Sequence, residues 1–384
     1  MTVTTPPPTG VAPDGDDRPP IIRVEGLGKT FQVTRRRAGR LGALRGLGSR
    51  SSDAVSAVEG VSFTVQPGEM VGYIGPNGAG KSTTIKMLTG ILNPTAGEAT
   101  VDGLVPWRQR KRLAGRIGVV FGQRTQLWWD LPLIDSLDLL RHVYRVPADR
   151  FRANLDRFRE LLDLDPFLAT PVRQLSLGQR MRGDLAAALL HDPPILYLDE
   201  PTIGLDVIAK ARVLDFLAAV NRDRGVTVLL TTHDMDDIEK LCRRLMILDH
   251  GRLVYDGELA TIRDRFGTHR TLVVDLDLDL ELDRGAGDGL AGPHPADPLA
   301  DLGLPGVETV RIDGPRRWVR FDRSLVSAAE VIAAVVARTH VSDLRVEEPS
   351  IEAIIRHIYE RGVGADAPAG VPPKVPAGTA DGPT

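Results

Sequence analysis

One eight-residue segment has the residue types and the spacing that hold a phosphate group. Gly75-Pro76-Asn77-Gly78-Ala79-Gly80-Lys81-Ser82 matches the P-loop pattern of glycine, four residues, glycine, lysine and serine or threonine. Its glycines let backbone N–H groups turn toward phosphate oxygens, and the positive end of a following helix favours negative charge. Lys81 is predicted to reach the β- and γ-phosphates, and Ser82 to ligate a bridging Mg²⁺. A glycine-rich turn without a ligand is the alternative.

Two carboxylates follow an apolar run that reads as a buried strand. Residues 195–198 are apolar and lead directly into Asp199 and Glu200. A carboxylate at the tip of a strand beside a P-loop serves Mg²⁺ through its water shell, so Asp199 is predicted as a metal residue. Glu200, one position later, is predicted to polarise the water that attacks the γ-phosphate. Taken without the P-loop, the same pair fits a solvated turn equally well.

These motifs need a sheet that holds strand ends side by side. Several short apolar runs suit strands that are buried on both faces of a largely parallel sheet. The runs are residues 70–74, 117–121, 195–198 and 226–231. Helical patterns follow at residues 82–88 and 149–163, where apolar residues recur at steps of three and four. The order predicts an α/β fold with a helical insert at about residues 124–190.

The pattern changes from about residue 271. Apolar and acidic residues nearly alternate over 271–282, two strand-like runs follow at 307–312 and 316–321, and a helical pattern covers 325–338. This order predicts a small α+β accessory domain over residues 267–362, after a first domain over residues 21–266. The acidic residues of the first strand are interpreted as a solvated face and not as a calcium site, because no chelating loop accompanies them. They are Asp275, Asp277, Asp279 and Glu281.

Composition narrows the class of protein. The 384 residues, 42% hydrophobic and 26% charged, exclude a fibrous or wholly disordered chain, although residues 1–20 and 363–384 are predicted to be disordered tails. The net charge of −3 offers no electrostatic reason to expect nucleic acid as a partner. The single cysteine, Cys242, cannot form an intrachain disulfide and is interpreted as a packed apolar residue in a helix-like run, 237–245. No apolar run approaches the roughly 20 residues that cross a bilayer.

Five motifs in order resemble those of the ATP-binding cassette (ABC) ATPases. They are the P-loop, Leu175-Ser176-Leu177-Gly178-Gln179, the strand ending in Asp199-Glu200, Gly204-Leu205-Asp206 and Thr232-His233-Asp234. The resemblance covers about residues 21–266 and implies a P-loop NTPase fold that hydrolyses ATP with Mg²⁺. It implies Lys81, Glu200 and His233 as catalytic residues. It also implies Ser82, Gln123 and Asp199 as metal residues.

The same resemblance implies which residues contact ATP. They are Phe31, Gly75, Pro76, Asn77, Gly78, Ala79, Gly80, Lys81, Ser82, Thr83, Gln123, Ser176, Gly178, Gln179 and Asp206. Phe31 stands where the family stacks an aromatic ring on adenine. Ser176 and Gly178 belong to the segment Leu175–Gln179, the signature, which in the family contacts the γ-phosphate held by the P-loop of a second subunit. Leu177 stands where a glycine is usual.

Longer segments resemble the ATPase subunits of multidrug exporters related to the viologen and daunorubicin systems. They are residues 121–124, 127–132, 175–182 and 229–235. This resemblance implies transmembrane permease subunits as partners, a homodimer or a heterodimer with a second cassette, and a peripheral position on the cytoplasmic face of the membrane. An importer ATPase and a soluble clamp on ribosomes or DNA are the alternatives. The single cassette and the lack of a heptad run argue against the clamp.

Two further features are each open to two interpretations. The insert at residues 34–52 carries six arginines and is either a solvated loop or a patch that meets anionic lipid or an acidic partner. Trp128 and Trp129 are either partly buried core residues or part of the socket that receives a coupling helix of the membrane subunit in the family.

Overall fold

The computed structural model describes residues 18–34, 52–122, 124–266, 269–277 and 297–361. The chain forms two compact units, Met1–Asp256 and Gly257–Thr384. The second unit includes helix α9 (Leu259–Phe266). The predicted domain boundary, after residue 266, had placed this helix in the first domain. Residues 1–17 and 363–384 of the predicted tails, residues 35–51 of the arginine-rich insert, and Gln123 lie outside the described residues.

Six strands form the central sheet of the first unit. In the order in which they pair, they are β5 (Ile117–Phe121), β6 (Ile195–Asp199), β7 (Thr227–Thr231), β3 (Met70–Ile74), β8 (Arg244–Asp249) and β9 (Arg252–Glu258). The first five of these run parallel, and every residue of β3 and β7 is buried. A strand that is covered on both faces has to be apolar throughout, which is why unbroken apolar runs predicted it. The largely parallel sheet is confirmed.

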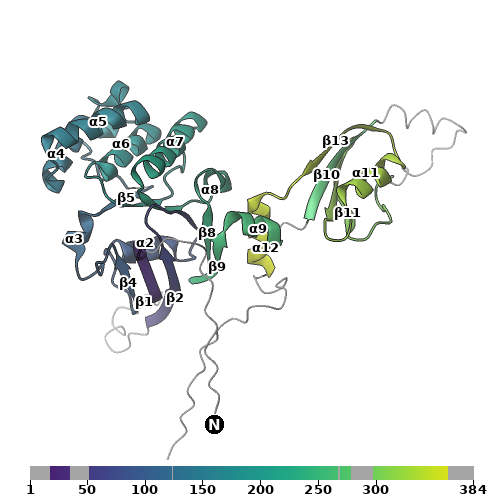
Figure 1. Ribbon diagram of the computed structural model, residues 1–384, viewed down its shortest axis with the longest axis horizontal. Helices are drawn as coiled ribbons and strands as arrows, with labels where there is room; N and C mark the ends of the chain where they lie inside the picture. The colour runs from purple at the N-terminus through teal and green to yellow at the C-terminus, as the bar shows by residue number, and fades with distance from the viewer. Residues whose placement is uncertain (1–17, 35–51, 123, 267–268, 278–296, 362–384) are drawn as a thin grey trace, which may run out of the picture. The chain divides into compact units, whose positions relative to one another are not determined.

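A second, antiparallel sheet of three strands was not predicted. In pairing order the strands are β2 (Ser52–Val65), β1 (Ile22–Thr34) and β4 (Ala96–Val101). Helix α2 (Lys81–Leu88) packs between this sheet and the central sheet, because its residues Ile85 and Leu88 share one hydrophobic core with Val24 of β1 and Tyr73 of β3. The helix that begins at the P-loop is therefore fixed from both sides (Figure 1).

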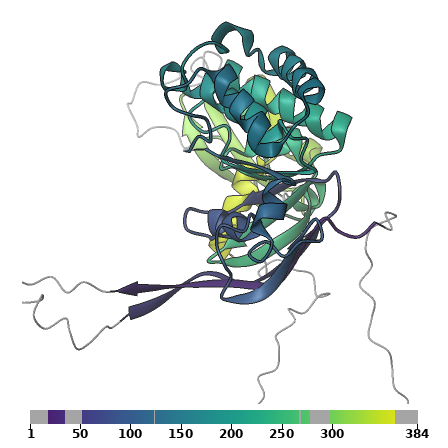
Figure 2. The ribbon, with the colours of Figure 1, turned by 90° about the vertical axis from the view of Figure 1, so that its left-hand side faces the viewer.

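The predicted helical insert is present between β5 and β6. It contains α4 (Leu133–Tyr144), α5 (Ala148–Leu162) and α6 (Leu177–Leu189), and it lies beside α7 (Val207–Arg224). The four apolar residues that predicted α5 are all buried: Phe151, Leu155, Phe158 and Leu162. Figures 1 and 2 show these helices on one side of the central sheet and α2 on the other.

One predicted helix is shorter than expected. Helix α8 ends at Leu241, and Cys242 follows it with an extended backbone, so the helix-like run 237–245 does not continue through the cysteine. The apolar residues after it join β8, where they are buried beside β3, and burial in the sheet outweighs their helical spacing. Cys242 is buried, as interpreted, and burial raises the pKa of its thiol to about 12.

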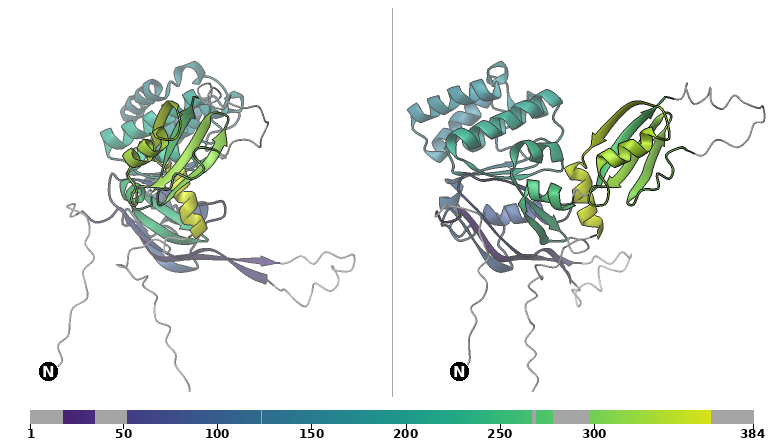
Figure 3. Two further views of the ribbon diagram at one scale, coloured as in Figure 1. Left: turned by 90° about the vertical axis from the view of Figure 1, so that its right-hand side faces the viewer. Right: turned by 45° about the vertical axis from the view of Figure 1, so that its right-hand side comes forward.

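The second unit contains a four-stranded antiparallel sheet, which fits the predicted α+β domain. Its strands pair in the order β11 (Val307–Asp313), β12 (Arg316–Asp322), β10 (His269–Leu276) and β13 (Val341–Glu347). Helix α11 (Ala328–Val336) lies across one face, where Leu272, Val274 and Val319 pack against Val331 and Val335 (Figure 3). Helix α12 (Ile351–Arg361) packs on α9. Within the described residues no helix is long and apolar enough to cross a membrane.

Candidate functional site

The P-loop connects β3 to α2 through a turn that only glycine fits. Gly80, directly before α2, has a φ of +102°, in the left-handed region that side chains avoid. A Cβ atom placed on it would lie 2.4 Å from the carbonyl oxygen of Ala57 in β2. The antiparallel sheet therefore presses against the loop, and the loop leads into the N-terminus of α2 in the arrangement that binds anions.

Lys81 is held inside this loop. Its Nζ atom donates hydrogen bonds to the carbonyl oxygens of Gly75, at 2.6 Å, and Pro76, at 3.1 Å. Burial lowers the pKa of the Lys81 ammonium, while the nearby charges of Glu200 and Asp199 oppose that shift. An ammonium group that has only neutral carbonyl oxygens as hydrogen-bond acceptors gains more from an anion such as a phosphate.

The two predicted carboxylates lie at the carboxyl end of β6. The Oδ1 atom of Asp199 accepts a hydrogen bond of 2.7 Å from the hydroxyl of Thr231 at the end of β7. The next residue, Glu200, has a φ of +56°, and its N–H donates to the carbonyl oxygen of Thr231 at 3.0 Å. A Cβ atom on Gly122 would come within 2.6 Å of the carbonyl oxygen of Glu200. Neighbouring strand ends therefore fix the unusual turn that presents this carboxylate.

A pocket of about 350 Å³ joins the P-loop to these carboxylates. Ser82, Asp199 and Glu200 line it, together with Lys86, Ile91, Phe121, Gly122, Arg124 and Ile203. Ser82 and Asp199 bring an oxygen donor each, which is the ligand type that Mg²⁺ prefers. Within the described part of the chain, no three His, Cys, Asp or Glu residues form a metal cluster of their own. This donor set fits a metal that takes its remaining ligands from phosphates and water.

His233 lies next to the predicted base. Its Nδ1 atom is 3.7 Å from Oε1 of Glu200, and its side chain is exposed. The following residue, Asp234, accepts a hydrogen bond from the N–H of Asp236 and caps α8. Tertiary structure therefore brings the ends of β3, β6 and β7 together at one edge of the sheet, as their motifs required.

A buried polar network supports the His233 loop, and the sequence did not reveal it. Lys210 of α7 pairs with Asp234 and, at 2.8 Å, with the fully buried Asp237. Asp237 also accepts a hydrogen bond of 2.5 Å from the hydroxyl of Thr202. The network fastens α7, the segment after Glu200 and α8 to one another. No local pattern pointed to it, because its members come from three separate segments of the chain.

The signature and the Asp206 turn lie at helix starts. Ser176 caps α6: its hydroxyl accepts a hydrogen bond from the N–H of Gln179 at 3.2 Å, and Gln179 Oε1 accepts one from the N–H of Ser176 at 2.9 Å. Asp206 caps α7 by accepting from the N–H of Ala209 at 2.8 Å. Gly178 is buried beside Ala209. None of these residues lines the pocket of Ser82 and Glu200.

Known proteins share this arrangement. The ABC transporter family model matches residues 58–203. The daunorubicin resistance ATP-binding protein DrrA3 of Streptomyces coeruleorubidus is 32% identical over 305 residues, which are 79% of this chain and 90% of that protein. The chain belongs to the ABC transporter ATP-binding proteins. It is an ATP-binding cassette of the ATP-hydrolysing kind.

Further relatives of this ABC ATPase include one that is named for export and one that is named for import. The Nod factor export ATP-binding protein I of Burkholderia pseudomallei is 42% identical over 201 residues, 52% of this chain and 65% of that protein. The methionine import ATP-binding protein MetN 2 of Enterococcus faecalis is 32% identical over 218 residues, 56% and 63% of the two chains. A dimeric ATP-binding cassette in a post-hydrolysis state, bound to ADP and phosphate, is 25% identical, with a TM-score of 0.52 and coverage of 62% of this chain and 98% of that one.

Three predicted features of the cassette lie away from the pocket or outside the described residues. Phe31 is an exposed residue of β1, with Nζ of Lys29 5.3 Å from the centre of its ring. Gln123 lies outside the described residues. Trp128 and Trp129 are 41% and 50% exposed, so they are only partly buried, and their part in a socket stays a prediction. The guanidinium of Arg180, from α6, lies 5.6 Å from the ring of Trp129.

Asp184 is a second residue of the cassette that the sequence did not reveal. It is buried in α6, and its Oδ1 atom accepts hydrogen bonds from the hydroxyl of Thr125, at 2.9 Å, and from the N–H of Gln126, at 3.1 Å. Burial raises the pKa of this carboxyl to about 6, although both hydrogen bonds oppose the shift. The helix that begins at the signature is thus tied to the segment that follows Gln123.

Proposed function

We propose that the protein is the ATPase subunit of a membrane exporter, which works as a pair of cassettes beneath separate transmembrane permease subunits. The observation that supports this most is the composition of the pocket. It holds Ser82, Asp199 and Glu200 but no residue of the signature, Leu175–Gln179. A second cassette, either another copy or a related chain, would supply the signature, and Ser176 and Gly178 would then contact the same ATP.

Each side chain of the site has its own task in the proposed reaction. Lys81 exchanges its carbonyl partners for oxygens of the β- and γ-phosphates. Ser82, Asp199 and Gln123 would hold Mg²⁺, which when bound neutralises charge on the phosphates. Glu200 takes the proton of the attacking water while that oxygen bonds to the γ-phosphorus and the bond to the leaving ADP oxygen breaks. His233, close to Glu200, orients the water and the γ-phosphate.

The remaining ATP contacts are proposed around this centre. The backbone of Gly75–Thr83 surrounds the phosphates, and Phe31 stacks on the adenine ring. Gln179 and Asp206 hold the helix starts that meet the second cassette, since both make capping hydrogen bonds there. We place the protein at the cytoplasmic face of the membrane. There the exposed Trp128 and Trp129, in the helical subdomain at about residues 124–190, contact a permease subunit.

Substitution of Glu200 by glutamine tests the hydrolytic role. The amide keeps the shape of the side chain but cannot take a proton, so we expect ATP binding to persist and a stable ATP-bound dimer to accumulate. Size-exclusion chromatography with light scattering detects the dimer, and phosphate release measures turnover. Glu239→Gln, a substitution on α8 outside the pocket, is the matched control. Unchanged turnover in Glu200→Gln would contradict the role proposed for Glu200.

Co-purification tests the transport role. The two relatives named for Nod factor export and daunorubicin resistance favour an exporter, whereas the methionine import relative keeps an importer as the second candidate. We expect permease subunits to be retained with the protein from detergent-solubilised membranes, and ATP to drive substrate out of the cytoplasmic side. Accumulation of substrate on the cytoplasmic side would favour the importer. Recovery with ribosomes or DNA alone would overturn both.

A further inference from the structure

The second unit has a sheet edge that no other strand covers within the described residues. Strand β13 pairs with β10 on one side only, and it is the last strand in the pairing order. Its residues from Ser342 to Val346 are all exposed. An exposed edge strand offers a row of backbone donors and acceptors to another chain.

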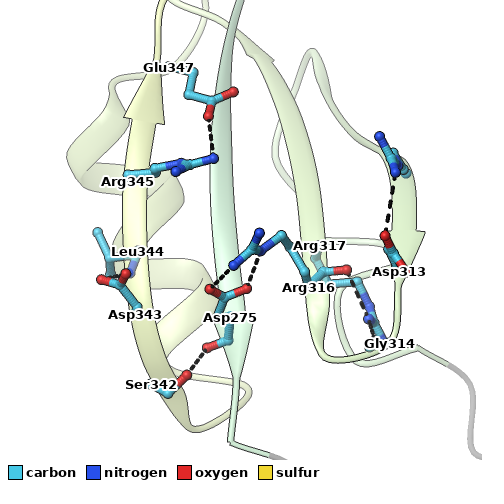
Figure 4. Close-up of polar contacts among 11 residues, drawn as sticks. Asp275, Asp313, Gly314, Arg316, Arg317, Ser342, Asp343, Leu344, Arg345 and Glu347 are labelled. Atoms are coloured by element: carbon cyan, nitrogen blue, oxygen red, sulfur yellow. Dashed lines mark hydrogen bonds and ion pairs between the residues drawn. The ribbon is translucent and has the colours of Figure 1, made fainter.

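One hydrogen bond shows which backbone groups face outward. The N–H of Leu344 donates to the Oδ1 atom of Asp343, its own neighbour, at 2.8 Å, on the side of β13 away from β10 (Figure 4). Because both backbone groups of a residue in an antiparallel strand face the same way and alternate along the strand, those of Val346 also face outward, whereas the register shift between Asp343 and Val341 interrupts the alternation at Ser342. Leu344 is therefore an outward-facing residue on which a second strand can centre.

The charges of the edge strand match a second copy of the same strand. When two copies pair antiparallel with Leu344 at the centre, Asp343 of one copy lies opposite Arg345 of the other, and the reverse pair forms as well. Centring on Asp343 or on Arg345 would instead place identical charges opposite each other. Arg345 lies 2.8 Å from Glu347 on its own strand, and the Asp343 carboxylate accepts from the outward N–H of Leu344, so the pairing exchanges these two local contacts for contacts between the copies.

Asp343 and Arg345 lie on one face of β13, and apolar side chains on the opposite face support the same pairing. Leu344 and Val346 are opposite the core residues Val274 and Leu272 of β10, yet they are 37% and 38% exposed. With Leu344 at the centre, Leu344 meets Leu344 of the second copy, and Val346 lies two residues along the same face. The two α11 helices would then cover the same face of a continuous sheet, and the exposed leucines would bury each other.

We propose that β13 of one copy pairs antiparallel with β13 of a second copy, so that the accessory units join across a two-fold axis. Two backbone hydrogen bonds between the two copies of Leu344 and two Asp343–Arg345 pairs would form at the centre of the contact. This inference deepens the proposed function, because it gives the second unit a part in the pair of cassettes. The contact is small, so it acts mainly by raising the local concentration of one cassette near the other.

A cysteine at the centre of the contact gives a direct test. Leu344→Cys places two cysteines opposite each other with their Cα atoms about 5.5 Å apart, within the range of a disulfide. The native cysteine, Cys242, is buried and gives little background. Mild oxidation of the full chain should produce a covalent dimer, seen on a non-reducing gel. Ser342→Cys, which lies two residues from the centre and therefore not opposite itself, is the control. Equal cross-linking of both variants, or of neither, would overturn the pairing.

Charge reversal tests the register. Asp343→Arg and Arg345→Asp each put like charges opposite each other twice, so each should weaken self-association of the full chain about tenfold in analytical ultracentrifugation. An equimolar mixture of the two variants restores opposite charges at both pairs and should associate like the wild type. So should the double variant D343R/R345D. A mixture that stays as weak as its components would overturn the proposed register.

Proline at position 344 tests the backbone contact. The N–H of Leu344 does not bond to β10, so Leu344→Pro should leave the sheet and the circular dichroism spectrum intact while removing a central hydrogen bond. We expect self-association through the second unit to be lost. A folded Leu344→Pro chain that dimerises like the wild type would overturn the pairing.

The two proposals fail in different ways. Pairing of β13 does not need nucleotide, so Leu344→Cys should cross-link equally in a chain that also carries Lys81→Ala. If cross-linking fails but Glu200→Gln still accumulates an ATP-bound dimer, only the β13 inference is wrong. If cross-linking succeeds but Glu200→Gln forms no such dimer, the proposed function is wrong and the β13 contact stands.

Discussion

The site of the first unit and the outer face of the second unit's sheet both carry many charged side chains. On the sheet face these charges form ion pairs with one another, whereas in the described part of the site the lysine and the carboxylates do not. On the sheet face, Arg316 meets Asp275 across neighbouring strands (Figure 4). Arg320 meets Glu308 in the same way. In the site, Lys81 donates to carbonyl oxygens, and neither Asp199 nor Glu200 forms an ion pair with a lysine or arginine among the described residues.

This difference shows where ligand chemistry can occur. Charges that satisfy each other across strands leave little free energy for a ligand, and exposed pairs of this kind add little to stability. The site instead keeps an ammonium and two carboxylates apart at the ends of strands. Each of them can then gain from a phosphate, a metal or a water molecule.

Loss of the P-loop lysine should have the largest effect. Lys81→Ala removes the ammonium group that is proposed to pair with phosphate oxygens, so we expect ATP affinity to fall by at least about 100-fold and hydrolysis to be lost. Fluorescent nucleotide titration measures the affinity. Lys111→Ala, an exposed lysine of α3 (Arg110–Ala114), is the control and should bind normally. Near-normal affinity in Lys81→Ala would contradict the P-loop assignment.

Breaking the buried network should cost stability as well as activity. Lys210→Met leaves the carboxylate of Asp237 buried without its cation, so we expect the free energy of unfolding of the first unit to fall by about 3 kcal/mol. We also expect turnover to fall, since the network holds the His233 loop. Chemical denaturation and phosphate release measure the two effects, and Lys210→Arg should retain most of both. A fully stable Lys210→Met would show that the network does not support the loop.

Asp184 should introduce a pH dependence. Its pKa is raised from 3.8 to about 6, so between those values the folded state holds more protons than the unfolded state, and this group's contribution to stability falls as the pH rises. Asp184→Asn removes this pH-dependent contribution to stability, because the amide does not titrate. The stability of the variant relative to the wild type should therefore improve by about 2 kcal/mol between pH 4 and pH 7. A difference that stays constant across this range would contradict the buried, unpaired carboxyl.

The paired sheet face should be the least sensitive. Arg316→Ala breaks an exposed ion pair, so we expect only a slight change in the denaturation midpoint and none in the rate of ATP hydrolysis of the first unit. Asp275→Asn is the matched variant from the other side of the pair and should behave alike. A large loss of hydrolysis in either variant would show that the two regions are coupled. It would contradict the view that these ion pairs take no part in the chemistry of the site.

Much of the site could be read from the chain because its parts are local. The P-loop and the strand that ends in Asp199 and Glu200 each depend on neighbours within a few residues, so their spacing predicts them. The parallel strands can likewise be recognised from their own residues, because burial on both faces requires an unbroken apolar run. The order of these motifs then identified the family.

Tertiary structure decided the contacts between distant segments. The antiparallel sheet beside the P-loop, the Lys210–Asp237 pair and the bond from Asp184 to Thr125 join residues that no local pattern relates. The end of α8 at Leu241 was likewise set by the sheet, where burial of β8 outweighed helical spacing. The outward edge of β13 appears only once the pairing order is known, since a strand's sequence does not say which of its sides another strand will cover.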